Sequence, residues 1–439
     1  MRRLSLWTTL LALSAPASVL AQDKTITLTI TAGKHACENT PICVPLTVPR
    51  EFAHRTDISL TGDEAFQLIG QLTLPGLTTA HIKSADVHLL RRDLHVLVKH
   101  LAAGATAKLS LHFGKEVLSL NRFNWSGKPG EYLELRFGLD PKTVRPMLRY
   151  MHKDYDTSTA EARDRTYKVF HHLYDPAGKR LVTNGGQTDL QPGETKKLLY
   201  PHHRGLMFAY MRCTYGEGKS TTADTWHAKP GDTHQSHMAF VVPEEAGALL
   251  GRHCVLVDWH GPKKEVFAKE ERELTVYNVP GGTLVDFTSR LKTTGGTVKL
   301  DGDPQHAGFQ FRASNDVADK TAKQTYYVRP DGKGKPGETR NWEPKTKKGP
   351  INLPWDALSF VLDGKRYTVA YLNHPSNPGE SRWSERDYGR FGCYFAYDLT
   401  PERPLVVNYR IWLQNGEMTV PDVAALHTNF VEPPKVTVK

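Results

Sequence analysis

Histidine, arginine and tryptophan gather in short polar clusters in the C-terminal two thirds of the chain. Each cluster stands beside a short apolar run, and four of them are centred on His203, Trp226, His237 and His374. Strand ends and loops on a rigid β scaffold are where side chains are presented to ligands. The clusters therefore predict a cleft that binds a polar molecule.

His227 is the first candidate for a catalytic residue. It follows Trp226, an apolar plate of the kind that stacks on a sugar ring while an imidazole hydrogen-bonds or moves a proton. Asp224 stands three residues before His227 and is expected to orient it. The alternative is a histidine that closes a loop onto backbone carbonyls.

His202, His203 and Arg204 form the densest cluster. On an extended strand the two histidines point to opposite faces, unless Pro201 and Gly205 break that geometry. We therefore expect one histidine to be structural and assign His203 to substrate binding. Arg204 is assigned there too, because its planar fork of donors suits a carboxylate or sugar hydroxyls. An ordinary ion pair is the alternative for Arg204.

His234 and His237 could contribute to a metal site with Asp224, Asp232 and His227. A three-residue spacing places two side chains on one side of a helix but not of a strand, and it matches no named metal motif. Neutral hydrogen-bonding histidines are therefore preferred. The sequence assigns no metal ligand and leaves the cofactor open, and His237 is kept as a second candidate catalytic residue.

Glu271 is the candidate carboxylate. Glu271 and Glu273 share one face of a predicted strand and Arg272 takes the other. A carboxylate opposite a histidine supplies the base and the acid that ring opening or elimination on a sugar requires. The alternative is a solvated, charged strand face.

Two further segments add candidate substrate-binding residues. Arg312 ends an apolar strand, where a lone arginine usually has a specific partner. Two prolines stiffen the loop that carries His374 and Asn377, and Arg386 is expected to continue the same edge. We expect one cleft to collect the side chains of His203, Arg204, His227, Arg312 and His374.

Strands must position these residues, because period-two alternation dominates the chain. Alternation at 25–30, 94–98 and 107–113 predicts a small antiparallel β module over residues 22–118. Residues 124–130 resemble a linker to a large antiparallel β-sandwich over 119–432. The predicted fold class is all-β, with one amphipathic helix near 421–430 and an exposed excursion at 318–348.

The N-terminus indicates the compartment. Arg2 and Arg3 precede an apolar stretch at 4–13 and a cleavage-type segment at 19–21, which predicts a signal peptide over residues 1–21 and a secreted or periplasmic protein. No later segment approaches the roughly 18–20 apolar residues of a membrane span, so no membrane insertion is expected. Cys37 and Cys43 are expected to form a disulfide in an oxidising compartment, whereas Cys213, Cys254 and Cys393 are expected to be buried hydrophobes.

The distribution of charge argues against nucleic acid as a partner. The formal charge falls from +10 to +8 once the leader is removed, and basic residues are interspersed with acidic ones rather than massed. Nucleic-acid binding usually requires a clustered basic face. A carbohydrate or glycan ligand is expected instead, and the oligomeric state is left open.

The order of the motifs resembles that of a known family. Tyr200 to Gly205, then Trp226-His227, then Gly308 to Arg312, then His374 to Pro378 and Trp383 to Gly389 are similar to a largely uncharacterised secreted bacterial family labelled methane oxygenase PmoA. The resemblance covers roughly residues 140–432. It implies a large sandwich similar to the galactose-mutarotase type, whose concave face commonly handles sugars.

Three functions remain open at this point. The first is a carbohydrate-active hydrolase, lyase or epimerase that uses His227, His237 and Glu271. The second is a glycan-binding module without catalysis, which would keep Trp226 and the arginines. The third is a metal-dependent oxidoreductase, as the family label implies. No serine-hydrolase triad signature, phosphate-binding loop or dinucleotide fingerprint supports a fourth.

Overall fold

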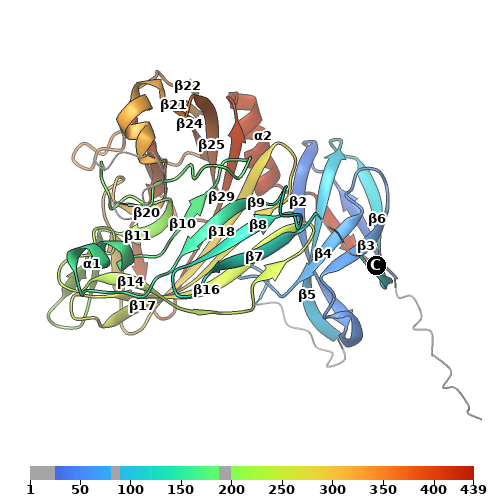
Figure 1. Cartoon of the computed structure of the whole chain (residues 1–439), viewed down its shortest axis with the longest axis horizontal. Coiled ribbons are helices and arrows are strands. Elements are labelled where there is room, and N and C mark those ends of the chain that lie inside the picture. Colours follow the sequence, from blue (N-terminus) through green and yellow to red (C-terminus); the bar gives the residue numbers. More distant parts are fainter. Residues whose placement is uncertain (1–24, 81–88, 118, 120, 187–198) are drawn as a thin grey trace, which may run out of the picture.

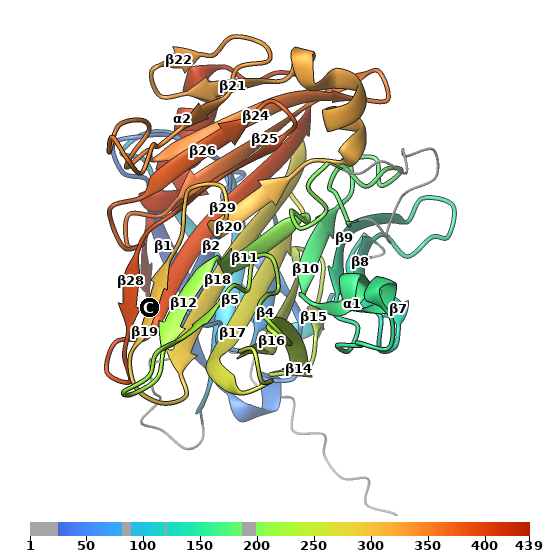
Figure 2. The ribbon, with the colours of Figure 1, turned by 90° about the vertical axis from the view of Figure 1, so that its left-hand side faces the viewer.

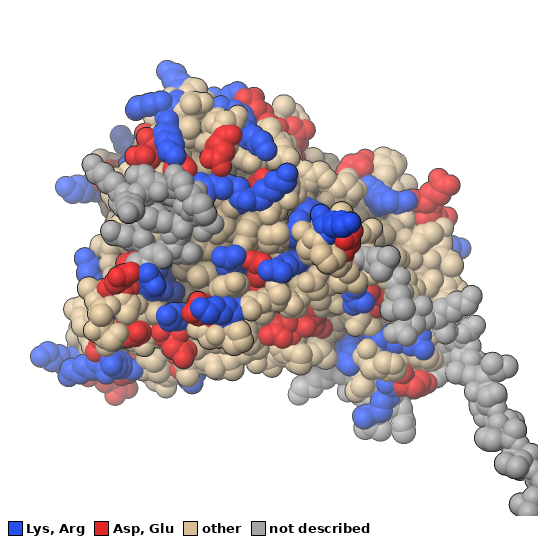
Figure 3. Space-filling model, in the orientation of Figure 1, with Lys and Arg blue, Asp and Glu red and all other residues tan. Residues whose placement is uncertain are grey.

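The computed structural model describes residues 25–80, 89–117, 119, 121–186 and 199–439, and they form an all-β protein, as expected (Figure 1, Figure 2). The predicted signal peptide lies outside the described residues. Among the helices that the structure describes, none is long and apolar enough to span a membrane. On the face shown in Figure 3, basic and acidic side chains are interspersed.

Two large antiparallel sheets face each other and form the sandwich. The first has nine strands in the order β23-β26-β27-β20-β11-β10-β9-β8-β7, and the second has ten, in the order β14-β16-β17-β18-β29-β25-β24-β21-β22 with β15 paired to β16. The strands of the nine-stranded sheet are β7 (Phe123–Lys128), β8 (Tyr132–Phe137), β9 (Arg145–Met151), β10 (Phe170–Leu173), β11 (Leu206–Tyr210), β20 (Ala307–Arg312), β23 (Arg340–Asn341), β26 (Arg382–Arg386) and β27 (Arg390–Tyr394). Those of the ten-stranded sheet are β14 (His234–Phe240), β15 (Glu245–Ala246), β16 (Leu250–His260), β17 (Val266–Tyr277), β18 (Gly282–Thr293), β21 (Tyr326–Arg329), β22 (Gly332–Lys333), β24 (Trp355–Leu362), β25 (Lys365–Asn373) and β29 (Leu405–Asn415).

Aromatic side chains from both sheets fill the space between them. Phe309 of β20 stacks on Phe287 of β18 with ring centroids 4.1 Å apart, and Tyr409 of β29 stacks on Phe309. The predicted alternation of β17 is confirmed: Arg272 is buried inside the sandwich and bonded to Glu270, whereas Glu271 lies on the opposite face, bonded to Arg290. The period of two thus separates a buried ion pair from a solvated one.

A third sheet of seven strands is built from both ends of the described chain. Its order is β2-β5-β4-β3-β6-β1-β30. The strands are β1 (Thr25–Thr31), β2 (Cys37–Pro49), β3 (Asp57–Gly62), β4 (Ile69–Thr73), β5 (Leu89–Leu101), β6 (Thr106–Glu116) and β30 (Lys435–Val438), with a short 3-10 helix η1 (Arg50–Phe52) after β2. The last strand, β30, pairs antiparallel with β1, so residues beyond 432 complete the N-terminal sheet.

The seven-stranded sheet is docked on the sandwich through buried polar groups. The amide of Gln71 in β4 accepts from the backbone N–H groups of Leu249 and Leu250 and donates to the carbonyl of Leu250. The carboxylate of Asp57 accepts from the N–H of Ala248 at 2.9 Å. These bonds satisfy backbone groups that would otherwise be buried without partners.

The remaining elements are short. A small sheet, β13-β12-β19-β28, comprises β12 (Arg212–Tyr215), β13 (Thr221–Ala223), β19 (Val298–Asp301) and β28 (Tyr397–Leu399). The helices are α1 (Ala160–Thr166), the π-helix η2 (Val317–Thr321), the 3-10 helix η3 (Ala322–Gln324) and α2 (Val420–Val431). Helix α2 confirms the predicted helix near 421–430, and it begins with a capping box between Thr419 and Asp422.

Two interpretations of segments were wrong. Residues 124–130 are not a linker, because residues 123–128 form β7, the edge strand of the nine-stranded sheet, with Gly130 in the turn that follows. The segment 318–348 is not wholly exposed, since all four residues of β21 are buried against β24. Its lysine- and glycine-rich composition describes the turns around β21 rather than the strand itself.

The predicted disulfide between Cys37 and Cys43 is also wrong. All five cysteines are free thiols, and these two lie six residues apart on the single strand β2. A strand rises about 3.3 Å per residue, which separates their Cα atoms by about 20 Å, whereas a disulfide requires roughly 4.4–6.8 Å. Cys213, Cys254 and Cys393 are buried, as expected.

Candidate functional site

The candidate site lies on the outer face of the nine-stranded sheet. Met207 and Ala209 of β11 point away from the sandwich core and pack with Phe170 and Trp226 into a small apolar cluster. The loop 199–205 lies next to this cluster, where the N–H of Arg204 donates to the sulfur of Met207. This apolar cluster therefore forms the floor of the site, meaning the buried surface against which the loops with the polar side chains pack.

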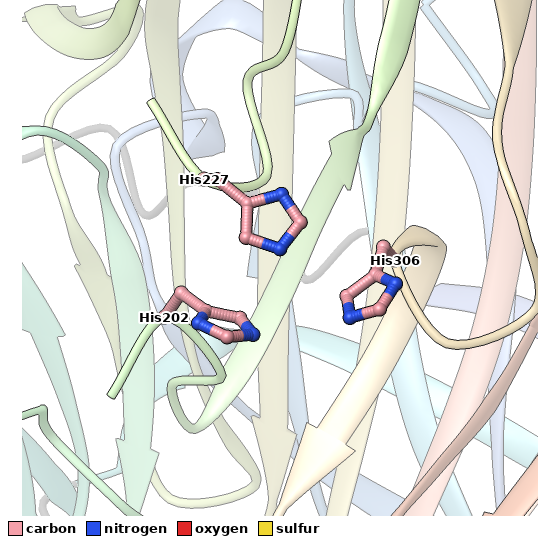
Figure 4. A group of neighbouring side chains, drawn as sticks. All are labelled: His202, His227 and His306. Atoms are coloured by element: carbon pink, nitrogen blue, oxygen red, sulfur yellow. The ribbon is translucent and has the colours of Figure 1, made fainter. Parts of the chain in front are cut away.

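Three histidines from three loops converge at this floor. His202 precedes β11, His227 follows β13 and His306 precedes β20. One ring nitrogen of each lies within 4.8 Å of the corresponding nitrogens of the other two, and Figure 4 shows the three rings turned toward a common space. All three side chains are half-buried, which leaves this space open to solvent. We call these residues the three-histidine centre.

A carboxylate orients two of the three imidazoles. Asp224 accepts from the N–H of His227 at 2.8 Å and contacts Nδ1 of the same residue at 2.8 Å. Asp303 contacts Nδ1 of His306 at 3.0 Å. Because a carboxylate accepts a hydrogen bond from Nδ1–H, the neutral form of each ring carries its free lone pair on Nε2, which is then available as a ligand. The expectation that Asp224 orients His227 is confirmed.

Within the part of the chain that the structure describes, no carboxylate contacts His202, and its surroundings hold the ring neutral. Burial, together with the neighbouring charges of His227 and Lys168, lowers the pKa of His202 to about 2. Its buried Nε2 has no hydrogen-bond partner among the described residues. A neutral imidazole with an unpaired nitrogen is a ready metal ligand and a costly group to bury otherwise.

Lys168 fastens two of the loops that carry these histidines. Its ammonium donates to the backbone carbonyl of His202 at 3.0 Å and to that of Trp226. Burial, aided by the charge of Arg204, holds the pKa of Lys168 well below its usual value. The side chain is 3% exposed, so it acts on the centre through the backbone.

The structure brings together several residues that the sequence assigned to one cleft. His203 lies beside the centre, with its ring centroid 4.3 Å from that of His202 and 5.4 Å from Trp226. Both histidines share one region because the loop is a turn, in which the N–H of His203 donates to the carbonyl of Tyr200. Arg312 reaches the same region through Tyr388, over whose ring it lies.

Three of these neighbours differ from their expected roles. Arg204 is 1% exposed and uses its guanidinium on Asp164 and on the carbonyl of Pro201, so its donors face the protein. Arg312 donates to the carbonyls of Ala313 and Tyr388 and fixes loops in the same way. Trp226 is fully buried beneath the loops, so it cannot stack on a sugar ring.

Other candidates lie elsewhere. His237 lies on β14, where it contacts Tyr150 of β9 and the neighbouring His152, and burial lowers its pKa to about 4. Glu271 is paired with Arg290 and Lys292, whose hydrogen bonds and charges lower the pKa of its carboxyl. The charged strand face is therefore the better interpretation of Glu271, which does not face His227.

The loop at 374–378 also lies outside the centre. His374 packs against Phe430 of α2, and Asn377 donates to the carbonyl of Asn408 and accepts from its N–H. Arg386 ends β26, and its N–H donates to the hydroxyl of Tyr327. The expectation that His374 joins the same cleft as His227 was wrong, because its strand end belongs to the ten-stranded sheet.

Sequence reasoning missed His306, Asp303 and Lys168. A repeated pattern could have found the first two, because Asp224 and Asp303 each stand three residues before a histidine. Both pairs form the same local arrangement, with the carboxylate on Nδ1. Lys168 carries no comparable signal, since a single lysine before a strand resembles any surface lysine.

Comparison with known proteins gives a family but no activity. A family of unknown function, DUF6807, matches residues 143–428, and the chain belongs to this family. No curated protein matches the chain. The matched segment contains all three histidines and both orienting aspartates, whereas β1 to β6 and β30 lie outside it.

Proposed function

We propose that this protein is a metal-dependent enzyme whose metal is held by the three-histidine centre. The observation that carries the proposal is the convergence of three imidazole nitrogens, two of them oriented by Asp224 and Asp303. Metal-bound histidines usually have such a carboxylate or carbonyl on the other ring nitrogen. Imidazole suits zinc, copper, iron and nickel, with zinc the first candidate.

A catalytic role fits this ligand set better than a structural one. Structural zinc sites use four protein ligands, whereas catalytic sites use three and leave a position for water or substrate. The side chains of His227 and His306 are 20% and 23% exposed, so that position is reachable from solvent. A metal bound there would lower the pKa of a bound water or polarise a substrate oxygen.

For the substrate we propose a carbohydrate. Tyr200 is 43% exposed, and its ring lies 5.9 Å from that of His203 and 5.0 Å from that of Tyr388, so it can supply the stacking surface that buried Trp226 does not. The resemblance to sugar-handling sandwiches supports the same class of substrate. Zinc would favour a hydrolase, lyase or epimerase, whereas copper or iron would favour an oxidoreductase.

Metal content and activity test this proposal together. Mass-spectrometric metal analysis of the wild type and of His227→Ala/His306→Ala is expected to differ by one equivalent per chain. Turnover on a panel of oligosaccharides should disappear with that equivalent and return when metal is restored to the chelated wild type. His112→Ala provides the control, since that partly exposed histidine lies on β6 of the seven-stranded sheet and its side chain bonds Thr61.

Two results would count against the proposal. Equal metal content in the wild type and the double variant would show that the metal is not bound at this centre. Glycan binding that persists without any turnover in the metal-loaded protein would instead favour a non-catalytic binding module.

A further inference from the structure

A second group of ligand-type side chains lies between the seven-stranded and ten-stranded sheets. Cys43 of β2 pairs directly with His95 of β5, and Asp93 stands two residues before His95 on the same strand. Cross-strand partners and alternate residues share one face of a sheet, so the three side chains point the same way. One ligand atom of each lies within 4.8 Å of the other two.

Two of these side chains are buried with unpaired atoms. Asp93 is 1% exposed, and its Oδ2 accepts from the N–H of Gly76 at 2.9 Å and from the hydroxyl of Thr79. Apart from an interaction of the carboxylate with the Cys43 thiol, its Oδ1 has no hydrogen-bond partner among the described residues. His95 is 3% exposed: its Nε2 bonds Thr73 at 3.0 Å, while Nδ1 has no partner there. Unpaired buried groups of this kind are costly, and a bound cation would satisfy both.

The excess of carboxylates around the group also favours the binding of a cation. The guanidinium of Arg252 is bonded to Glu245 and lies close to Glu273 and Asp93. Three carboxylates thus surround one guanidinium, and burial raises the pKa of Glu245 and of Glu273. His95 adds no charge, because burial, followed by the nearby Arg252, holds its pKa well below the usual value.

We propose that Cys43, Asp93 and His95 bind a divalent transition metal of the zinc type, independently of the three-histidine centre. Thiolate, imidazole and carboxylate are the side chains that zinc prefers. Binding converts the Cys43 thiol to the thiolate and releases its proton to solvent. The group borders a cavity of about 410 Å³ that is also lined by Glu273, Arg410 and Phe430, so a water or a small ligand can complete the coordination.

Zinc titration in the absence of the first centre tests this site. The His227→Ala/His306→Ala chain, stripped with a chelator and titrated with Zn²⁺ alone, is expected to bind one equivalent. Adding Cys43→Ser or His95→Gln should weaken that equivalent by more than the roughly 10–100-fold typical of outer-shell changes. Adding Cys37→Ser is the matched control, since Cys37 lies on the same strand outside the group.

Thiol labelling of the unmodified chain gives a second measurement that needs no variant. Cys43 is the one exposed cysteine of the five. Desolvation and the nearby Asp93 raise the pKa of its thiol, so labelling with a maleimide is expected to be slow but still selective for Cys43, and Zn²⁺ should slow it further by at least about tenfold. Labelling that Zn²⁺ leaves unchanged, or a zinc equivalent that survives Cys43→Ser, would overturn the proposal. Loss of metal from the three-histidine centre has no bearing on either readout.

Discussion

Asp224 and Asp303 show how a single side chain sets the chemistry of its neighbour. Each fixes the tautomer of a histidine three residues later, so that Nε2 and not Nδ1 faces the centre. The local turn supplies this geometry, because the backbone N–H of His227 donates to the same carboxylate that holds its ring. Residue type and spacing together therefore prepare the ligand before any metal binds.

Asp224→Asn tests this arrangement. The amide oxygen can still accept from the His227 N–H, but the amide nitrogen can only donate to Nδ1, which places the imidazole proton on Nε2. We expect the affinity of the centre for Zn²⁺ to fall by roughly 10–100-fold, measured by competition with a chromophoric chelator.

Asp301→Asn is the matched control for this variant. Asp301 pairs with Arg212 at 3.0 Å at the surface, and its side chain is 43% exposed. Unchanged zinc affinity in Asp224→Asn would show that the carboxylate does not set the tautomer of His227.

The sequence predicted part of the site because some of its residues carry a local signal. His227 beside Asp224 was recognisable from spacing alone. His306 lies 79 residues after His227 in the sequence, and it joins the centre only because β11 pairs with β20. The role of Trp226 was misjudged because composition cannot distinguish an exposed aromatic plate from a buried floor. Burial of that kind is decided by tertiary packing.

At the scale of elements, strands β10 and β16 place two histidines against each other across the sandwich. Nε2 of His171 lies 3.0 Å from Nε2 of His253, and both side chains are fully buried. Burial, with the charge of each neighbouring histidine and of Arg272, holds the pKa of His171 well below its usual value and lowers that of His253 to about 3. This pair requires neutral rings.

We therefore expect the sandwich to lose stability in acid. A histidine with a lowered pKa in the folded state contributes stability that is fully present above its unfolded value, about 6.5, and is lost as the pH falls from there toward 3. The upper limit of this loss is about 1.4 kcal/mol per pH unit for each group. Urea unfolding at a series of pH values between 7.5 and 4 measures it.

His253→Gln isolates the contribution of the pair. Glutamine can hydrogen-bond to His171 but does not titrate. The slope of unfolding free energy against pH should therefore become shallower, by up to the slope that the uptake of one proton on unfolding contributes. The same slope in the variant and in the wild type would assign the acid sensitivity to other buried histidines, such as His95 and His203.

Element boundaries were predictable where turns carry their own chemistry. The apolar segment 360–372 contains such a turn: Asp363 and Gly364 both have positive φ and join β24 to β25 as a hairpin. An Asp-Gly pair between apolar runs is a strong hairpin signal that can be recognised from the sequence. The buried strand β21 was not predictable in the same way, because its four residues are too few to show a period.

At the scale of the whole molecule, the seven-stranded sheet depends on the last few residues. Val436 of β30 packs against the apolar cluster of that sheet, and the backbone of Lys439 exchanges two hydrogen bonds with that of Thr27. We expect deletion of residues 433–439 to destabilise the protein by about 2–4 kcal/mol, from one partly buried valine and several strand hydrogen bonds. Thermal unfolding measures this loss.

The control for the deletion is Val438→Thr, which keeps a β-branched residue at a position that is 45% exposed. Its unfolding temperature should match that of the wild type. An equally stable deletion variant would show that β1 does not need β30 as a neighbour, although an uncovered edge of β1 invites pairing with another chain.

The pairing of β30 with β1 also determines the order in which the sheets can be completed during synthesis of the chain. A ribosome makes β1 to β6 first, yet the sheet they form lacks one edge strand until residues 435–438 have emerged, some 400 positions after β1. The sandwich between them has by then all of its strands available. The seven-stranded sheet is therefore translated first but completed last. Until then the unpaired edge of β1 is exposed, and we expect a chaperone to bind there while the chain is still growing.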